Sequence, residues 1–205
     1  LQAVAEDFVT HYEARLEEGS TVEGKAMFVC SNRFIAYSLY KKIVALRPEW
    51  AKLPNDNSLS SQYAMAAESM ALYGNNPLPI ERIKLVMTRN KDDEKELWDL
   101  LGTDEDRKKL DVQFKNPHSN FKIAIVVDMW ITGFDVPCLD TMYIDKPLQQ
   151  HTLIQTISRV NRVYPGKDKG LVVDYFGIKK KLNTALKRYA EGDIDANSIE
   201  TIEQS

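Results

Sequence analysis

Two arginines spaced three residues apart could bind a phosphoryl group. The segment QTISRVNR at residues 155–162 places Arg159 and Arg162 on one face of a predicted helix. Two guanidinium groups that converge from one helix can hold a phosphoryl group through directed, charge-assisted hydrogen bonds. The alternative is a pair of solvated surface arginines, which the spacing alone does not exclude. The buried side of the helix would consist of Ile154, Ile157 and Val160.

A second candidate segment, VDMWITGFDVP at residues 127–137, follows a predicted strand. Gly133 would let a ligand approach the backbone closely. The carboxylate of Asp135 could accept hydrogen bonds from ribose hydroxyls, and Trp130 could either stack on a base or pack in the core. Taken alone, the segment is equally typical of a tight corner between a strand and a helix.

A third candidate site lies where another strand ends, at Cys30, Ser31, Asn32 and Arg33. Ser31 or Asn32 could cap the helix that follows. The free backbone amides there could bind a nucleic-acid phosphate, to which Arg33 would add positive charge. A plain helix cap is the alternative.

Residues 19–26, GSTVEGKA, nearly match the phosphate-binding pattern G-x-x-x-x-G-K-[ST]. Ala26 stands where a hydroxyl group must reach magnesium. The segment also precedes a strand, whereas a phosphate-binding loop follows a strand and opens a helix. The sequence therefore predicts that this segment is not such a loop.

Short apolar runs alternate with amphipathic segments along the chain. The runs predict strands at 25–30, 83–88, 122–127, 141–145 and 170–174. The amphipathic segments predict helices at 1–18, 32–46, 152–163 and 178–190, two short helices broken at Gly102 within 92–114, and a polar, frayed tail at 192–205.

This alternation is typical of a parallel sheet covered by helices on both faces. Ligands of such sheets bind beyond the carboxyl ends of the strands. We therefore expect the arginine pair and the other candidate residues at that edge of the sheet.

Composition and charge narrow the class of protein. The 205 residues are 43% hydrophobic and 28% charged, and no run approaches the roughly 20 apolar residues of a membrane span. Glu6, Asp7 and Glu13 argue against a signal peptide. Cys30 and Cys138 lack metal-ligand spacing, which favours a reducing cytosol.

The net charge of −3 is unevenly distributed. Residues 146–190 contain ten basic and two acidic residues, a net charge of +8, and the rest of the chain carries −11. This basic part predicts a surface that faces phosphates, with a solvated lysine-rich helix as the alternative.

The candidate segments occur in an order that resembles motifs IV, V and VI of the second RecA-like motor domain of superfamily-2 helicases. The runs KAMFVCSNR, VVDMWITGFDVPCLDTMYIDKPLQ and QTISRVNRVYPGKDKGLVVDYFG look more specifically like the motor (R) subunit of type I restriction enzymes. The resemblance is close over 25–48 and 120–177, and limited to element order over 49–119. Thr156 and Asn161 stand where many helicases have Arg and Gly, which favours the restriction-enzyme branch.

The resemblance implies an α/β fold, a RecA-like parallel sheet of about five or more strands flanked by helices, with helical extensions at both ends. It divides the chain into a helical lead-in (1–20), the second motor domain (21–177, with a partly helical insertion at 49–119) and the start of a helical region (178–205). It also implies an ATP-driven DNA translocase and site-specific deoxyribonuclease whose nuclease domain and phosphate-binding loop are not in this sequence. We therefore expect a fragment that is inactive alone.

The same resemblance implies roles for five residues near the nucleotide. Arg162 would be the arginine finger that meets the γ-phosphate of ATP, with Arg159 assisting. Gln155, Gly133 and Asp135 would lie near the nucleotide, which is bound with Mg²⁺ mainly by the first motor domain.

Three residues would contact double-stranded DNA, namely Asn32, Arg33 and Thr132. The further partners would be the modification and specificity subunits and the first RecA-like domain of the same chain, in the cytoplasm. Two alternatives stay open: another superfamily-2 motor in DNA repair or RNA unwinding, and a non-catalytic nucleic-acid-binding module.

Overall fold

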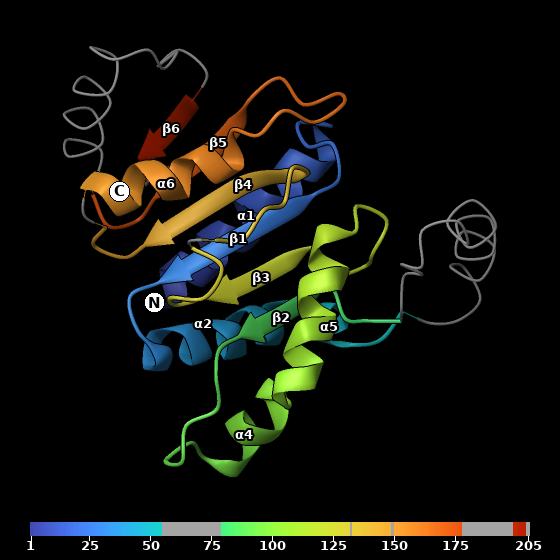
Figure 1. Cartoon of the computed structure of the whole chain (residues 1–205), viewed down its shortest axis with the longest axis vertical. Helices are drawn as coiled ribbons and strands as arrows, with labels where there is room; N and C mark the ends of the chain where they lie inside the picture. The colour runs from blue at the N-terminus through green and yellow to red at the C-terminus, as the bar shows by residue number, and fades with distance from the viewer. Residues whose placement is uncertain (55–78, 132, 149, 178–198, 204–205) are drawn as a thin grey trace.

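The computed structural model describes residues 1–54, 79–131, 133–148, 150–177 and 199–203. Within these residues, six parallel strands form one sheet (Figure 1). Their order is β2-β3-β1-β4-β5-β6, so β1 lies at the centre between β3 and β4. The strands are β1 (Lys25–Cys30), β2 (Ile83–Val86), β3 (Ile123–Val126), β4 (Leu139–Asp145), β5 (Gly170–Asp174) and β6 (Ile199–Glu203).

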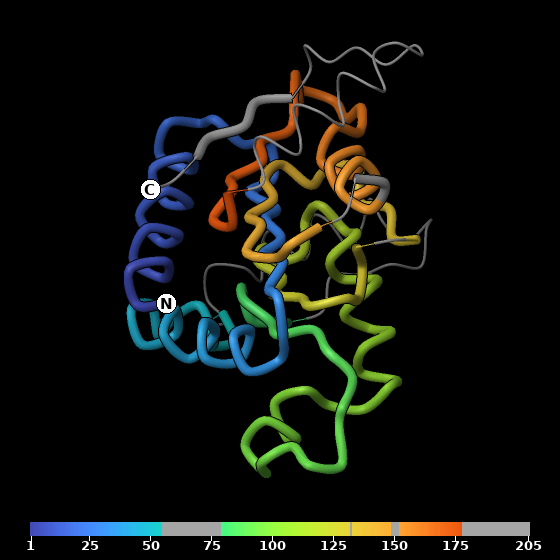
Figure 2. The backbone as a smooth tube through the Cα atoms, turned by 90° about the vertical axis from the view of Figure 1, so that its left-hand side faces the viewer, coloured from blue at the N-terminus to red at the C-terminus, as the bar shows by residue number. Residues whose placement is uncertain are grey.

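Helices cover both faces of the sheet (Figures 1 and 2). Helices α1 (Gln2–Glu17) and α2 (Arg33–Leu46) lie on one face, and α5 (Asp104–Lys115) and α6 (Gln150–Val160) lie on the other. The 3-10 helix η1 (Pro48–Ala51) follows α2, and the short α4 (Lys95–Leu101) packs near β2.

Alternating side chains of the strands build two apolar cores. Phe28 of β1 belongs to the core under α1 and α2, whereas Met27 and Val29 belong to the core under α5 and α6. Burial on both faces explains why the strands are continuous apolar runs rather than alternating ones.

The predicted fold class and the five predicted strands are confirmed, with small shifts in their bounds. Strand β4 begins at Leu139, two residues before its predicted start, and β2 ends at Val86. The predicted break at Gly102 is also confirmed. Gly102 has a φ of +62°, and Thr103 then caps α5 by accepting a hydrogen bond from the Asp106 amide while the Asp106 carboxylate accepts one from the Thr103 amide.

The prediction of a frayed tail is wrong for residues 199–203. They form β6, which pairs with β5 from Gly170 to Asp174. The sequence IETIE lacks the apolar run that marked the other strands, so periodicity did not reveal it. The predicted helix at 178–190 lies outside the described residues.

Helix α1 belongs to the core of the domain. The ring of Phe8 lies 5.5 Å from that of Phe28 and 4.7 Å from that of Tyr143, measured between centroids. The hydroxyl of Tyr12 donates a hydrogen bond of 2.9 Å to the carbonyl oxygen of Gly24. These contacts fix the helix against β1 and β4.

A fully buried lysine begins β1. Nζ of Lys25 donates to the carbonyl oxygens of Phe121 at 2.5 Å and Gln113 at 3.4 Å. Burial, with Lys122 acting in the same direction, lowers the pKa of Lys25 from 10.5 to about 7. Lys25 thus lies inside the domain rather than at a helix N-terminus, as expected for a segment that is not a phosphate-binding loop.

Lys25→Met should weaken the pH dependence of the stability of the 205-residue chain. Between its folded pKa of about 7 and its ordinary value of 10.5, Lys25 binds more protons in the unfolded state. The free energy of unfolding of the wild type should therefore rise with pH, by up to about 1.4 kcal/mol per pH unit. Urea unfolding at about pH 7.5 and about pH 9.5 measures this rise.

Lys108→Met, at an exposed position on α5, is the matched control and should keep the full rise. An equal rise in wild type and Lys25→Met would show that Lys25 stays protonated inside the fold.

Candidate functional site

Arg159 joins the candidate helix to the candidate loop (residues 127–138). Nε of Arg159 donates a hydrogen bond of 3.1 Å to the carbonyl oxygen of Ile131, and Nη1 donates to the carbonyl oxygen of Phe134. The side chain is half-buried. An arginine from one candidate motif therefore binds the backbone of another.

Arg162 and Asp135 form a second link between the same segments. Nε of Arg162 lies 3.4 Å from Oδ1 of Asp135, and the two side chains are 52% and 58% exposed. An exposed ion pair of this kind contributes at most about 1 kcal/mol. Arg162 can therefore exchange Asp135 for another anionic group at a small cost in free energy.

Gln155 lies one helical turn before Arg159 on α6 and is half-buried. Its backbone carbonyl accepts a hydrogen bond of 2.9 Å from the hydroxyl of Ser158. Residues four apart share a helix face, so Gln155 and Arg159 lie on the same side of α6.

This cluster does not lie at the carboxyl edge of the sheet, and that expectation is wrong. Helix α6 begins after the carboxyl end of β4 and ends beside the start of β5, where a Cβ atom on Gly170 would lie 2.3 Å from the carbonyl oxygen of Val160. A helix that connects two parallel strands must return to the amino edge. Arg159 lies in the last turn of α6, whereas Arg162 lies two residues beyond its end, so the prediction that one helix carries both arginines is wrong. The 127–138 loop also runs back, to the start of β4.

The 127–138 loop has an unusual backbone. Trp130 has a φ of +66° and Gly133 a φ of +72°. The ring of Trp130 stacks on Phe134 at 4.2 Å and lies 5.4 Å from Phe114, with 9% of the residue exposed. Of the two predicted alternatives for Trp130, the structure therefore has it packed in the core.

Gly133 is exposed, and a Cβ atom built on it would have no neighbour within 4 Å. Its positive φ, rather than a lack of space, is what favours glycine there.

Asn32 and Arg33 lie at the carboxyl edge, apart from the arginine cluster. Oδ1 of Asn32 accepts a hydrogen bond of 2.9 Å from the amide of Ile35 and so caps α2. Nη2 of Arg33 lies 2.5 and 2.6 Å from the carboxylate oxygens of Asp93, and Nη1 donates to the carbonyl oxygen of Thr88. Thr132, the third predicted DNA contact, lies outside the described residues.

Sequence reasoning missed Lys146, which follows β4 at the same edge. Its Nζ lies 2.5 Å from Oδ1 of Asp128 and donates to the carbonyl oxygen of Val127 at 3.0 Å. A cavity of about 110 Å³ near this edge is lined in part by Arg33, Thr88 and Asp128. The sequence could have revealed this pair, because Asp128 and Lys146 come directly after predicted strands and so should meet at the carboxyl edge of the sheet.

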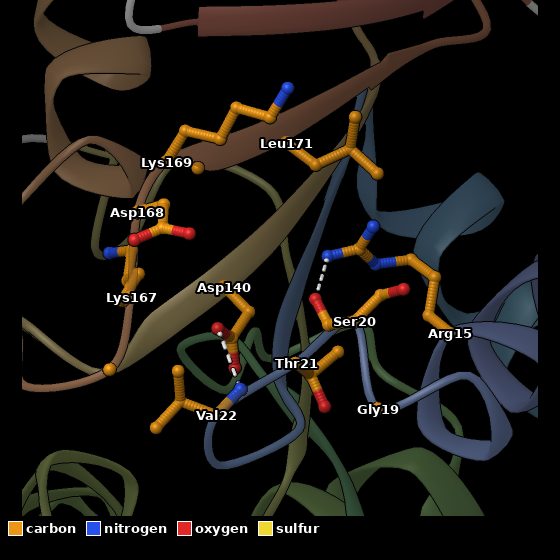
Figure 3. Close-up of a pocket in the computed structure, with 12 residues that line it drawn as sticks. Arg15, Gly19, Ser20, Thr21, Val22, Asp140, Lys167, Asp168, Lys169 and Leu171 are labelled. Carbon is orange, nitrogen blue, oxygen red and sulfur yellow. Dashed lines mark hydrogen bonds between the residues drawn. The ribbon is translucent and has the colours of Figure 1, made fainter.

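A larger cavity, of about 290 Å³, lies at the amino edge and was also missed (Figure 3). The carboxylate of Asp140 accepts hydrogen bonds from the amides of Val22 at 3.2 Å and Glu23 at 3.3 Å. Nη2 of Arg15 donates to the carbonyl oxygen of Ser20 at 2.7 Å. These bonds fix the segment before β1. The cavity is lined by Arg15, Gly19, Ser20, Thr21, Val22, Asp140 and residues 166–171.

Among the described residues, no cluster of His, Cys, Asp or Glu could hold a metal ion. Cys30 and Cys138 are both buried, and neither forms a disulfide. Burial raises the pKa of the Cys138 thiol. No helix in the described part of the chain is long and apolar enough to cross a membrane.

The comparison with known families decides the identity. The family model for type I restriction enzyme subunit R domain 3 matches residues 23–177. The chain belongs to this family. The match includes the three candidate segments, and it removes the support for a DNA-repair or RNA-unwinding motor.

Two curated relatives of this R-subunit domain agree. The type I restriction enzyme HindI endonuclease subunit of Haemophilus influenzae is 39% identical over 189 residues, which cover 91% of this chain and 16% of that one. The putative MjaIXP endonuclease subunit of Methanocaldococcus jannaschii is 38% identical over 191 residues, covering 93% and 15%. The chain thus spans about one sixth of the length of these relatives.

A solved structure of Saccharomyces cerevisiae Dbp5 bound to Gle1 and IP6 has a TM-score of 0.50 to the R-subunit domain. The two are 16% identical, and the alignment covers 98% of this chain and 39% of that one. At this identity the likeness concerns the RecA-like fold alone.

The Arg33–Asp93 pair should show strong coupling in a double-mutant cycle. Arg33→Ala leaves the Asp93 side chain, only 7% exposed, without its guanidinium partner, and should lower the free energy of unfolding by about 1–3 kcal/mol. The double variant Arg33→Ala/Asp93→Ala should lose clearly less than the sum of the single losses. Urea unfolding of the four proteins measures this coupling.

The exposed Lys109–Asp106 pair, at 3.4 Å, is the control and should give coupling below about 1 kcal/mol. Additive losses for Arg33 and Asp93 would contradict a structural role for their ion pair.

Proposed function

We propose that this chain is the second motor domain of the DNA-translocating and DNA-cleaving subunit of a type I restriction system. In the complete subunit it would supply an arginine finger and part of the DNA-binding track. The observation that carries the proposal is the family match over residues 23–177, which includes the segments around Arg33, Asp135 and Arg162.

The proposed finger is Arg162, with Arg159 assisting. Because Arg162 is half-exposed and holds Asp135 in a loose, exposed pair, it can exchange that carboxylate for a phosphoryl oxygen without unfolding its surroundings. A guanidinium group in this role stabilises charge that spreads over the transferring phosphoryl group. ATP, bound with Mg²⁺ mainly by the first motor domain, supplies that group.

Exchange of partners at Arg162 would couple the nucleotide to domain motion. Arg162 would contact the γ-phosphate of ATP but would lose this contact after hydrolysis. The binding free energy of the contact would therefore favour the closed arrangement of the two motor domains only while ATP is bound. Asp135 and Gly133 lie in the 127–138 loop, so the release of Asp135 by Arg162 would also change the contacts of that loop. The loop would then pass the change to the DNA.

The proposed DNA contacts are Asn32, Arg33 and Thr132. Arg33 can bind a phosphate only by leaving Asp93, so its share of the DNA affinity should be reduced by the cost of breaking that pair. Contacts to phosphates carry no sequence information. Movement along double-stranded DNA should therefore be nearly independent of sequence and sensitive to salt.

The proposal includes the modification and specificity subunits as partners and the cytoplasm as the location. Two buried cysteines that form no disulfide are compatible with a reducing compartment. The specificity subunit would supply the recognised DNA sequence.

The 205-residue chain alone should not hydrolyse ATP. Its near-match to a phosphate-binding loop has Ala26 in place of the hydroxyl residue, and Lys25 is buried. Phosphate release by the purified chain with Mg²⁺, ATP and duplex DNA should equal the background without protein. Turnover that co-purifies with the chain would overturn this part of the proposal.

Arg162→Ala in the full-length subunit should lower the ATPase rate by roughly 10³–10⁵ and stop translocation, because the transition-state charge loses its guanidinium. Equilibrium binding of ATP should largely survive. Steady-state ATPase and nucleotide-binding assays measure the two effects.

Lys109→Ala is the matched control, since the Lys109–Asp106 pair has the same 3.4 Å separation and comparable exposure. It should leave both activities near wild type. Near-normal turnover of Arg162→Ala would remove this residue from the mechanism.

A further inference from the structure

Arg159 uses its guanidinium group in a way that differs from that of Arg162. Nε and Nη1 both donate to backbone carbonyl oxygens, those of Ile131 and Phe134. These carbonyls are three residues apart in the 127–138 loop. The planar guanidinium presents its donors in a fixed fork, so the two contacts hold the backbone at Ile131 and at Phe134 at set positions relative to α6.

The loop needs such support because its backbone is held in an uncommon conformation. Trp130, a bulky residue, has a φ of +66°, in the left-handed region. The stack of Trp130 with Phe134 and Phe114 supports the loop through its side chains. The guanidinium group of Arg159 supports it through its backbone.

The base of Arg159 is itself fixed by close packing. Val160, the next residue, lies against Gly170 at the start of β5, and a Cβ atom on Gly170 would lie 2.3 Å from both Cγ1 and the carbonyl oxygen of Val160. Only glycine permits this approach of α6 to the strand. The last turn of α6 therefore has one position relative to the sheet.

The positions of Arg162 and Asp135 both depend on the contacts of Arg159. Asp135 directly follows Phe134, whose carbonyl Arg159 holds, and Arg162 follows three residues after Arg159. We propose that Arg159 is a positioning residue that sets the separation of Arg162 and Asp135 by holding the 127–138 loop to α6. The inference rests on the proposed role of Arg162 and specifies how Arg159 assists it.

Hydrogen–deuterium exchange of the full-length subunit without nucleotide tests this role. In Arg159→Lys the positive charge remains, but the rigid fork of two separate nitrogens, Nε and Nη1, that spans the two carbonyl oxygens is lost. Exchange of the peptide covering 128–139 should rise about tenfold or more, as expected for losing two hydrogen bonds. Arg159→Ala should give at least the same rise, and Gly170→Ala, which displaces the same turn, should also raise it.

Arg89→Lys is the matched control, because Arg89 is also half-buried and donates Nε to a backbone carbonyl, that of Trp98, at 2.9 Å. It should leave the 128–139 exchange unchanged, as should Arg162→Ala. Steady-state ATPase on the same proteins should show that Arg159→Lys lowers kcat with little change in KM for ATP.

The outcomes separate the two proposals. Unchanged exchange in both Arg159→Lys and Arg159→Ala would overturn the positioning role, even if ATPase activity is lost. An equal rise in Arg162→Ala would also overturn it, since Arg162 would then hold the loop. Normal ATPase in Arg162→Ala, with raised exchange in the Arg159 variants, would overturn the proposed finger and retain the loop contact.

Discussion

The hydrogen bonds from Arg159 to the carbonyl oxygens of Ile131 and Phe134 join the two segments on which the proposed chemistry depends. One segment is the 127–138 loop, which follows β3, and the other is helix α6, which follows β4. The close packing of α6 on Gly170 fixes one side of this joint, and the aromatic stack around Trp130 fixes the other. Loosening either side would move Arg162 relative to Asp135.

Three basic residues of the candidate segments and the nearby carboxyl edge form ion pairs, whereas Arg159 binds backbone carbonyl oxygens. Arg33 holds Asp93, Lys146 holds Asp128 and Arg162 holds Asp135. The pairs differ in how easily they can exchange. Asp93 is 7% exposed, and both of its carboxylate oxygens lie within 2.6 Å of Nη2 of Arg33, whereas Asp135 is 58% exposed and lies 3.4 Å from Arg162. Of these three pairs, Arg162–Asp135 is therefore the one best suited to switching partners during a catalytic cycle, and Arg33–Asp93 is better suited to fixing α2 to the segment before α4.

Local patterns in the sequence were sufficient for most of the sheet. The apolar runs of β3 and β5 and the break at Gly102 follow from the physics of burial and of helix ends. Strand β6 could not be found this way, because IETIE carries no apolar run and is defined by its pairing with β5. The partners of Arg33 and Arg159 are likewise long-range, 60 and 28 residues away in sequence, and no periodicity encodes them. The prediction for the arginine pair was wrong because the rule for parallel sheets concerns strand ends, whereas Arg159 lies at the end of the returning helix α6 and Arg162 just beyond it.

The most direct measurement is an experimental structure of the full-length subunit with Mg²⁺ and a transition-state mimic of the γ-phosphoryl group. In that structure the guanidinium of Arg162 should leave Asp135 and lie about 3 Å from an oxygen of the mimic. Arg159 should stay hydrogen-bonded to the carbonyl oxygens of Ile131 and Phe134. An Arg162 that still pairs with Asp135, with Arg159 released from the loop and bound to the mimic, would contradict the account.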